Sequence, residues 1–326
     1  MRTLVTLLTV FLVALIGATA AQPEGVLRLY TSQPDADAAS TKAAFEALHP
    51  GVTVEIFRSG TEQVIARFLL EAEAGSPQAD VLLVADGPTF ELLKARDLLE
   101  TYVSPEASAI DAVYLDPDGQ YAGTKILATV IVYNTTMVPD PVSSWAELAE
   151  LEDGAVAMPS PSYSGAAAYN LGVFTRDARL GWAWFETLAT RDVFLTQGNG
   201  AVLRSVAGGE VPYGVVVDFL PIRAAAEGSP VAVIYPTEGV PLITEPVGIV
   251  KGNANPEAAR AFVDFLLSAA GQEVASGMGY MPLRSDVAAP EGFPALAELT
   301  VLSAPAAELA RTRDDDKERF ATLFGE

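Results

Sequence analysis

Hydroxyl- and glycine-rich turns precede several expected helices, and turns of this kind are suited to binding an oxyanion. The segment Ser162-Tyr163-Ser164-Gly165-Ala166 leads into an expected helix at 166–175. The N–H groups at a helix start lack intrahelical partners and the dipole is positive there, so an anion can be held without Lys or Arg. Ser162 and Ser164 would add hydroxyl donors to a phosphate bound at Gly165 and Ala166. The same pattern is also typical of an ordinary helix cap.

Two similar turns are expected in the N-terminal part of the chain. Thr31, Ser32 and Gln33 follow an expected strand at 26–30, and Gly60 and Thr61 open an expected helix that runs to residue 73, with Thr61 as its cap. Ligands of open α/β sheets bind outside the carboxyl ends of the strands, so both turns are candidates for one binding site. Either turn could equally serve only to start its helix.

Three carboxylates follow expected strands and are further candidates. Asp86 ends a strand at 79–84, Asp218 follows a strand at 213–217, and Glu238 follows a strand at 230–235. Carboxylates accept hydrogen bonds from sugar hydroxyls or pair with a ligand ammonium group. Asp86 and Glu238 each precede a glycine and could be turn residues instead. Asp218 lies between apolar residues, where a carboxylate needs a partner.

These candidates lie on alternating strands and helices, which indicates an α/β fold of two lobes. Long apolar strands at 126–133 and 242–250 are expected to cross between the lobes and to act as a hinge. We therefore predict lobe 1 at 21–128 plus 247–326 and lobe 2 at 129–246, with a cleft between them. The segment from residue 256 onward is helical in pattern and is expected to pack on lobe 1.

The N-terminus has the features of a cleaved signal peptide. Arg2 precedes an apolar run at 4–16, and Ala18-Thr19-Ala20 is a small-residue cleavage site, so we predict a signal peptide at 1–20 and a periplasmic protein. The chain has no Cys and hence no disulfide. It carries 20 Lys and Arg against 42 Asp and Glu, a net charge of −22. This balance argues against a nucleic acid or an anionic membrane as partner.

Six segments in this order resemble the ferric-ion-type periplasmic solute-binding proteins of ABC importers. They are Leu29–Pro34, Phe57–Thr61, Ala79–Asp86, Val132–Thr135, Ser162–Ala167 and Glu245–Lys251, and the segment 255–284 is similar to the same family. The resemblance covers almost the whole chain after the leader. It implies a type II periplasmic-binding-protein clamshell, a small-molecule ligand and an ABC permease as partner.

The ligand differs between branches of this family. The iron branch is marked by an adjacent Tyr-Tyr pair, which this chain lacks, so we expect the sugar-phosphate or phosphonate branch and a small anionic ligand. Ferric ion is the alternative, with Tyr133, Tyr163 and Tyr213 as scattered candidate ligands. A ligand-loaded sensor with the same fold is a further alternative.

An enzymatic function is not expected from this sequence. With no Cys and a single His in a His-Pro-Gly turn, Cys-His and Ser-His-Asp arrangements are implausible, and no nucleotide-binding glycine motif follows a strand. Paired carboxylates for glycoside chemistry stay open, since their spacing is spatial. We expect no cofactor and a monomer.

Overall fold

The computed structural model describes residues 23–326. The signal peptide predicted at residues 1–20 therefore lies outside the described residues. Strands and helices alternate along the described chain, as the sequence pattern predicts. Within residues 23–326, no helix is both long and apolar enough to cross a membrane.

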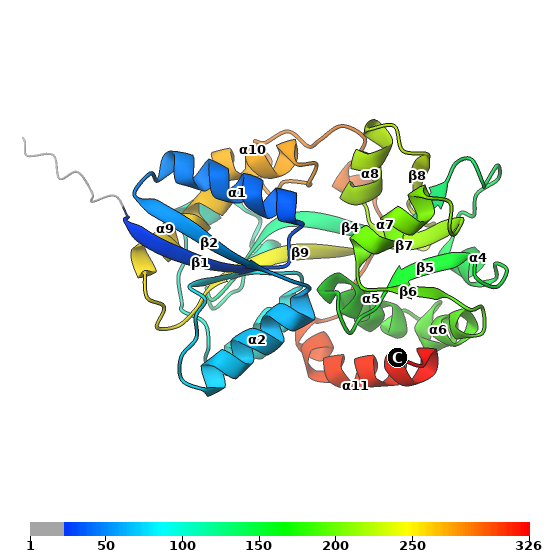
Figure 1. Ribbon diagram of the computed structural model, residues 1–326, viewed down its shortest axis with the longest axis horizontal. Coiled ribbons are helices and arrows are strands. Elements are labelled where there is room, and N and C mark those ends of the chain that lie inside the picture. Colours follow the sequence, from blue (N-terminus) through cyan, green and yellow to red (C-terminus); the bar gives the residue numbers. More distant parts are fainter. Residues whose placement is uncertain (1–22) are drawn as a thin grey trace, which may run out of the picture.

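One open sheet runs through the molecule (Figure 1). Its order is β2-β1-β3-β9-β4-β7-β5-β6, with β8 paired to β4 and β10 paired to β9. β1 pairs in parallel with β2 and β3, and β5 pairs in parallel with β6 and β7, as helical crossovers require. The strands are β1 Gly25–Thr31, β2 Val52–Arg58, β3 Val81–Leu83, β4 Ala122–Asn134, β5 Val156–Pro159, β6 Phe194–Thr196, β7 Tyr213–Val217, β8 Val231–Ile234, β9 Val240–Ile249 and β10 Val301–Leu302.

Helices cover both faces of this sheet (Figure 1). The α-helices are α1 Asp35–Leu48, α2 Thr61–Glu73, α3 Gly87–Ala95, α4 Trp145–Ala149, α5 Gly165–Arg176, α6 Gly181–Ala189, α7 Asn199–Ala207, α8 Phe219–Ala226, α9 Pro256–Leu267, α10 Ala269–Gly277 and α11 Ala306–Phe324. Short 3-10 helices lie at Pro105–Ala109, Ala112–Tyr114 and Leu296–Glu298. The sheet is thus enclosed between two helical layers, which is the layering expected for an α/β fold.

The molecule has separate apolar cores at its two ends. We call the part built on β1, β2 and β3 lobe 1 and the part built on β5, β6 and β7 lobe 2. In lobe 1, the ring of Phe45 on α1 packs edge-on against Phe262 on α9 at 5.0 Å. In lobe 2, Trp145 packs against Phe174 at 4.9 Å, and the indole N–H of Trp184 donates to the Trp145 carbonyl at 2.7 Å. Each lobe is therefore stabilised by its own buried aromatic residues.

The strands β4 and β9 connect the two lobes. β4 pairs with β9 over residues 122–128 and with β7 over residues 129–133, so one strand passes from lobe 1 into lobe 2. β9 pairs with β3 in lobe 1 and runs back beside β4 (Figure 1). These strands occupy the predicted crossing segments. Their action as a hinge and the lobe boundaries at 128/129 and 246/247 stay predictions.

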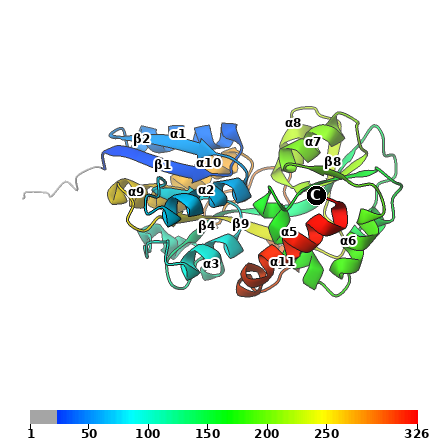
Figure 2. The same cartoon turned by 60° about the horizontal axis from the view of Figure 1, so that its bottom comes forward.

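The C-terminal segment does not all pack on lobe 1, contrary to our expectation. Helices α9 and α10 do pack there. Helix α11 instead contributes Leu309 and Phe320 to the core of lobe 2, where the Phe320 ring lies 5.9 Å from that of Phe185. Figure 2 shows α11 running along α5 and α6. It also contacts α3 of lobe 1, so α11 bridges the two lobes.

Candidate functional site

The starts of α2 in lobe 1 and α5 in lobe 2 meet where the lobes touch (Figure 1). The N–H of Glu62 faces the Tyr163 carbonyl at 3.4 Å. A Cβ atom on Gly165 would lie 2.8 Å from the Cβ of Thr61. Gly60 is the cap residue of α2 and Thr61 its first residue, so our assignment of Thr61 as the cap was wrong. Because both helices begin here, the positive ends of their dipoles converge.

The serine turn before α5 is divided between two environments. Ser164 caps α5, since its Oγ accepts from the Ala167 N–H at 3.3 Å, and Asn199 at the start of α7 donates to the same oxygen at 3.4 Å. Gly165 and Ala166 are buried at the lobe contact. Ser162 is exposed and its hydroxyl donates to the Glu326 carboxylate at 3.4 Å, after α11. Ser164 therefore lies at the converging helix starts, whereas Ser162 turns toward the end of α11.

The loop after β1 is held by its own hydroxyl groups. Thr31 Oγ1 donates to the Leu83 carbonyl at 2.8 Å and accepts from the Gln33 N–H at 3.1 Å. Ser32 Oγ accepts from the Ala85 N–H at 3.2 Å. These bonds fix the β1–α1 loop to the end of β3, so both hydroxyl groups are already used within the protein. The Gln33 side chain is 1% exposed and neither of its polar atoms has a hydrogen-bond partner.

Asp86 starts α3 and is already paired with a cation. Its Oδ1 accepts from the Thr89 N–H at 2.7 Å, and its backbone φ of 98° is unusual for a residue other than glycine. Its Oδ2 accepts from Arg313 of α11 at 2.6 Å, and Arg313 also donates to Glu62 of α2. Asp86 is therefore close to the helix starts, as predicted, and its charge is neutralised by an arginine that packs on lobe 2.

Asp218 is buried at the end of β7. Its Oδ1 accepts from the N–H groups of Phe219 at 2.9 Å and Ala128 at 3.2 Å, and its Oδ2 accepts from the Tyr235 hydroxyl at 3.3 Å. Burial, partly offset by these hydrogen bonds, raises the pKa of the Asp218 carboxyl to about 7. Near pH 7 the Asp218 carboxyl is therefore present in both its neutral and its charged form. Its hydrogen-bond partners belong to lobe 2 and to the crossing strand β4.

Replacing Asp218 by Asn is expected to reduce the pH dependence of stability. Because the pKa is higher in the folded than in the unfolded protein, the folded state binds this proton more tightly, and stability falls as pH rises from about 4 to about 7. The contribution is at most about 1.4 kcal/mol per pH unit. Urea unfolding of both proteins at pH 5 and pH 8 measures it, with exposed Asp314→Asn as the control. Equal pH dependence in Asp218→Asn and the wild type would contradict the assignment.

Glu238 does not lie with the other candidates. Its two carboxylate oxygens accept from the N–H groups of Trp145 at 3.1 Å and Ala146 at 3.0 Å, at the start of α4. An anionic side chain stabilises a helix start by satisfying these free N–H groups. Ser144 is the cap residue of α4, and Glu238 binds two further N–H groups at the start of this short helix, at the far end of lobe 2 (Figure 1).

Two buried charged residues near the lobe contact were missed by our sequence reasoning. Lys125 of β4 forms an ion pair with Glu245 of β9, and both side chains are less than one-tenth exposed. The ammonium group also lies 4.7 Å from the centre of the Tyr280 ring. A signal was present, since Lys125 comes directly before one apolar strand that was expected to cross, and Glu245 interrupts the other. Opposite charges in such strands indicate a buried pair.

A second arginine reaches from lobe 2 to lobe 1. Arg223 of α8 donates to the carboxylate of Asp37 on α1 at 3.0 Å. The hydroxyl of Tyr280 donates to the same carboxylate at 2.5 Å, and the Tyr280 ring packs on Phe219 at 4.2 Å. Burial is the main cause that raises the pKa of the Tyr280 hydroxyl, which is therefore a neutral donor. No local pattern in the sequence marks this cluster, because its members come from distant segments.

The three tyrosines proposed as iron ligands do not come together. Tyr133 and Tyr213 pair across β4 and β7, at the end of β7 opposite to Asp218, with ring centres 6.3 Å apart. Tyr163 lies instead against Gly60. Among residues 23–326, no group of three or more His, Asp or Glu side chains is arranged to hold a metal ion.

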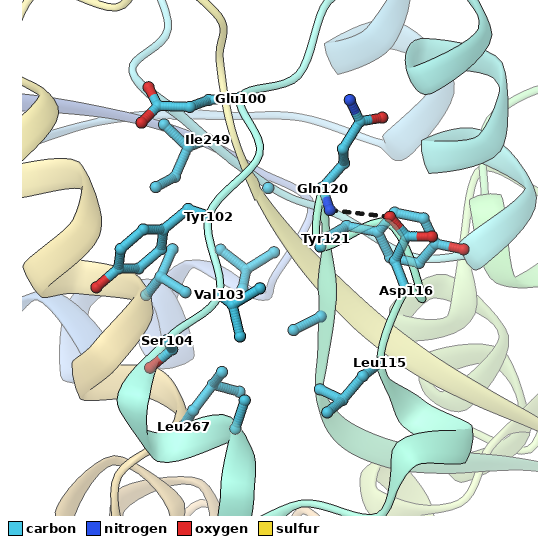
Figure 3. A pocket seen from close by; sticks show the side chains of 16 residues that line it. Glu100, Tyr102, Val103, Ser104, Leu115, Asp116, Gln120, Tyr121, Ile249 and Leu267 are labelled. Carbon is cyan, nitrogen blue, oxygen red and sulfur yellow. Dashed lines mark hydrogen bonds between the residues drawn. The ribbon is translucent and has the colours of Figure 1, made fainter.

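A cavity lies elsewhere, in lobe 1 (Figure 3). It has a volume of about 60 Å³ and lies between the segment 100–122, β9 and α9. Figure 3 shows Leu115, Leu267 and Ile249 on its walls, with Tyr102 at its side. None of the residues predicted to bind a ligand lines this cavity. It is therefore separate from the lobe contact.

The chain belongs to the bacterial extracellular solute-binding proteins, a family that it matches over residues 29–281. A putrescine/cadaverine-binding protein of Pseudomonas aeruginosa is 29% identical over 78% of this chain and 79% of the relative. An Fe(3+)-binding periplasmic protein of Serratia marcescens is 23% identical over 83% of this chain and 82% of the relative.

A solved structure confirms the predicted fold. The periplasmic binding protein AfuA from Actinobacillus pleuropneumoniae, with exogenous fructose-6-phosphate bound, matches with a TM-score of 0.84 and 22% identity. The match covers 92% of this chain and 98% of that chain. The two-lobe type II periplasmic-binding-protein fold is therefore established for this chain.

Proposed function

We propose that this protein binds a small phosphorylated or phosphonate-bearing solute between its lobes, in the periplasm, and delivers it to an ABC permease. The observation that carries the proposal is the meeting of the α2 and α5 starts at the lobe contact. A phosphate between them would receive N–H groups from both lobes, at the positive ends of two helix dipoles. Such a ligand would therefore stabilise the closed arrangement of the lobes.

The cationic side chains around this contact are already paired, so an anion would be held by the N–H groups of the helix starts. Lys125, Arg223 and Arg313 all lie at or next to the surface where the lobes meet, and each is paired with a carboxylate of the protein. The candidate residues that remain in the proposed site are Thr31, Ser32, Gln33, Gly60, Thr61, Asp86, Ser164, Gly165, Ala166 and Asp218. We propose that N–H groups at the starts of α2 and α5, other than those of Glu62 and Ala167, which already have partners, contact the phosphate directly, and that the other groups hold these turns in place.

The first experiment is native mass spectrometry of the protein as purified from its exported compartment. A bound mass that contains phosphorus supports the proposal and identifies the substrate class. A mass that corresponds to iron, together with a visible tyrosinate-to-iron absorption band, contradicts it. Such a result would favour the ferric-ion alternative, as in the Serratia relative.

Replacing Ser164 by Asp is expected to lower the affinity for a phosphorylated ligand by at least about 100-fold. Asp caps a helix as well as Ser does, so the fold is retained, but its negative charge would lie where the phosphate binds. Ser164→Asn is the matched control, because Asn also caps helices and is neutral. Isothermal titration calorimetry with fructose 6-phosphate measures both. Equal affinities for the Asp and Asn variants would remove this turn from the site.

A further inference from the structure

We propose that Arg223 of lobe 2 and Asp37 of lobe 1 form a latch that holds the two lobes together when no solute is bound. This inference goes beyond the proposed function, because it concerns the free protein and does not depend on which solute it binds. It is based on three observations: the hydrogen bonds of the arginine, the partners of the aspartate, and the buried contact beside the pair.

The guanidinium group of Arg223 makes its hydrogen bonds across the lobe contact. Arg223 belongs to α8, which packs on β7 and β8 in lobe 2. Its two terminal nitrogens donate to the two carboxylate oxygens of Asp37, at 3.0 and 3.3 Å, and one of them also donates to the Met278 carbonyl after α10. All of these acceptors lie in lobe 1. A two-pronged arginine–carboxylate pair is among the strongest polar contacts that a protein forms.

The carboxylate of Asp37 depends on lobe 2 for its charged partner. Its side chain is 4% exposed, and among the ion pairs of residues 23–326 it pairs with Arg223 alone. Within lobe 1 it is bound by the hydroxyl of Tyr280, which is a neutral donor. Removing one partner of a buried ion pair is costly, because the other charge is left without compensation. Parting the lobes would therefore remove the charged partner of Asp37, and the pair opposes that movement.

An aromatic contact between the lobes lies directly beside this pair. Phe219, the first residue of α8, packs on the Tyr280 ring of lobe 1 at 4.2 Å, and both side chains are buried. The guanidinium group of Arg223 lies 5.1 Å from the centre of the Phe219 ring and 5.8 Å from that of Tyr280. Cations are attracted to aromatic faces, and a site with little water strengthens charge pairs. The Arg223–Asp37 latch is therefore part of a contact that is closed without a solute.

A second set of ion pairs joins the lobes on the other side of the molecule. Arg313 and Lys317 of α11 both donate to the carboxylate of Glu62 on α2. Figures 1 and 2 show α8 and α11 on opposite sides of the connecting strands β4 and β9. The chain thus supplies polar contacts between the lobes on both sides of the place where α2 and α5 meet.

A latch of this kind would control access to the space between the lobes. A protein with two conformations binds from whichever of them is open to the ligand, and its apparent affinity is reduced by the fraction in which that conformation is present. A solute could then enter only when the Arg223–Asp37 pair separates, and could leave only when the pair separates again. The latch would therefore slow both the entry and the loss of the solute.

The test measures how often the lobes part in the free protein. The chain has no Cys, so one cysteine placed at the lobe contact reports on opening. Thr61→Cys places it at the start of α2, where the side chain is 2% exposed and faces Gly165 of lobe 2. Without solute, a maleimide at pH 7.5 is expected to label it at least about tenfold more slowly than the exposed Glu73→Cys. Adding Arg223→Met is expected to raise the labelling rate of Thr61→Cys about tenfold or more, the effect of losing hydrogen bonds to a charged group.

Two further variants make the test specific to the pair. Arg191→Met is the matched control, because Arg191 is 35% exposed against 31% for Arg223 and pairs with Glu150 inside lobe 2. It is expected to leave the labelling rate unchanged. Asp37→Asn is expected to raise the rate as Arg223→Met does. The double variant of Arg223 and Asp37 is expected to label no faster than the faster single variant, since both substitutions remove the same interaction.

Three results would overturn the inference. Labelling of Thr61→Cys as fast as that of Glu73→Cys would show that the lobes are apart in the free protein. An unchanged rate in Arg223→Met would show that the pair does not hold them, and effects that multiply in the double variant would show that the two residues act separately. All of these measurements are made without a solute, so their failure would leave the proposed function standing.

Discussion

Replacing Gly165 by Ala is expected to hold the lobes apart and to weaken ligand binding by about 10- to 100-fold, the effect of a steric clash of about 1–3 kcal/mol. The new Cβ would lie 2.7 Å from the Ala85 carbonyl oxygen and 2.8 Å from the Cβ of Thr61, and both atoms belong to lobe 1. Real Cβ atoms do not approach other atoms so closely. Neither neighbour is the end of a flexible side chain, so the clash can be relieved only by separating the lobes.

The same substitution should leave each lobe intact. Gly165 is the first residue of α5, and Ala is favoured over Gly in a helix. Gly277→Ala at the end of α10 is the matched control, because its Cβ would meet nothing within 4 Å. Gly60→Ala is a second test of the same contact, since its Cβ would meet the Tyr163 ring and carbonyl oxygen at 2.7 Å.

Small-angle X-ray scattering and calorimetry together measure the effect of Gly165→Ala. The variant is expected to be more extended than the wild type in the presence of fructose 6-phosphate, while its thermal unfolding stays close to that of Gly277→Ala. A compact variant with wild-type affinity would show that this contact does not form when the ligand binds.

Much of the fold could be predicted from the sequence because its signals are local. The apolar run at 126–133 and the strand at 213–217 correspond to β4 and β7, and Pro256 after Asn255 marks the start of α9. The position of α11 was not predictable in this way. Which lobe its apolar face contacts depends on the shape of the core around Trp184 and Phe185, and no pattern within residues 306–324 encodes that choice.

Which candidate residues lie close together could be predicted better than the partners that each of them has. Gly60, Gly165 and Asp86 lie together as expected, because they end or follow strands at one edge of the sheet. The partner of Asp86 is Arg313, 227 positions away, so no local pattern reveals that this carboxylate is neutralised. Glu238 lies apart from the other candidates for a similar reason, since the N–H groups that it binds belong to a helix more than 90 residues earlier.

Replacing Arg313 by Met is expected to lower the free energy of unfolding by about 3–5 kcal/mol, the cost of breaking a buried ion pair from one side. The Arg313 side chain is 8% exposed and contacts Asp86, which is fully buried, and Glu62, which is 18% exposed. Burial already raises the pKa of the Asp86 carboxyl, and Arg313 opposes that shift. Without the guanidinium group, the Asp86 carboxylate would be left buried and unpaired.

Arg319→Met is the matched control on the same helix. Arg319 pairs with Glu186, and both side chains are 53% exposed, so its loss is expected to cost less than about 1 kcal/mol. Urea unfolding at pH 7.5 compares the two variants. Equal losses for Arg313→Met and Arg319→Met would contradict a buried ion pair between α11 and α3.

The double variant Arg313→Met with Asp86→Asn separates the unpaired charge from the lost packing. Asn retains the cap on α3, because its oxygen can still accept from the Thr89 N–H, and it carries no charge. We therefore expect the second substitution to restore most of the stability lost at pH 7.5. In the single variant the pKa of Asp86 is higher in the folded than in the unfolded state, so its stability should fall as pH rises through the acid range. A single variant without this pH dependence, and no recovery in the double variant, would mean that Arg313 acts through its packing alone and that its charge does not link the lobes.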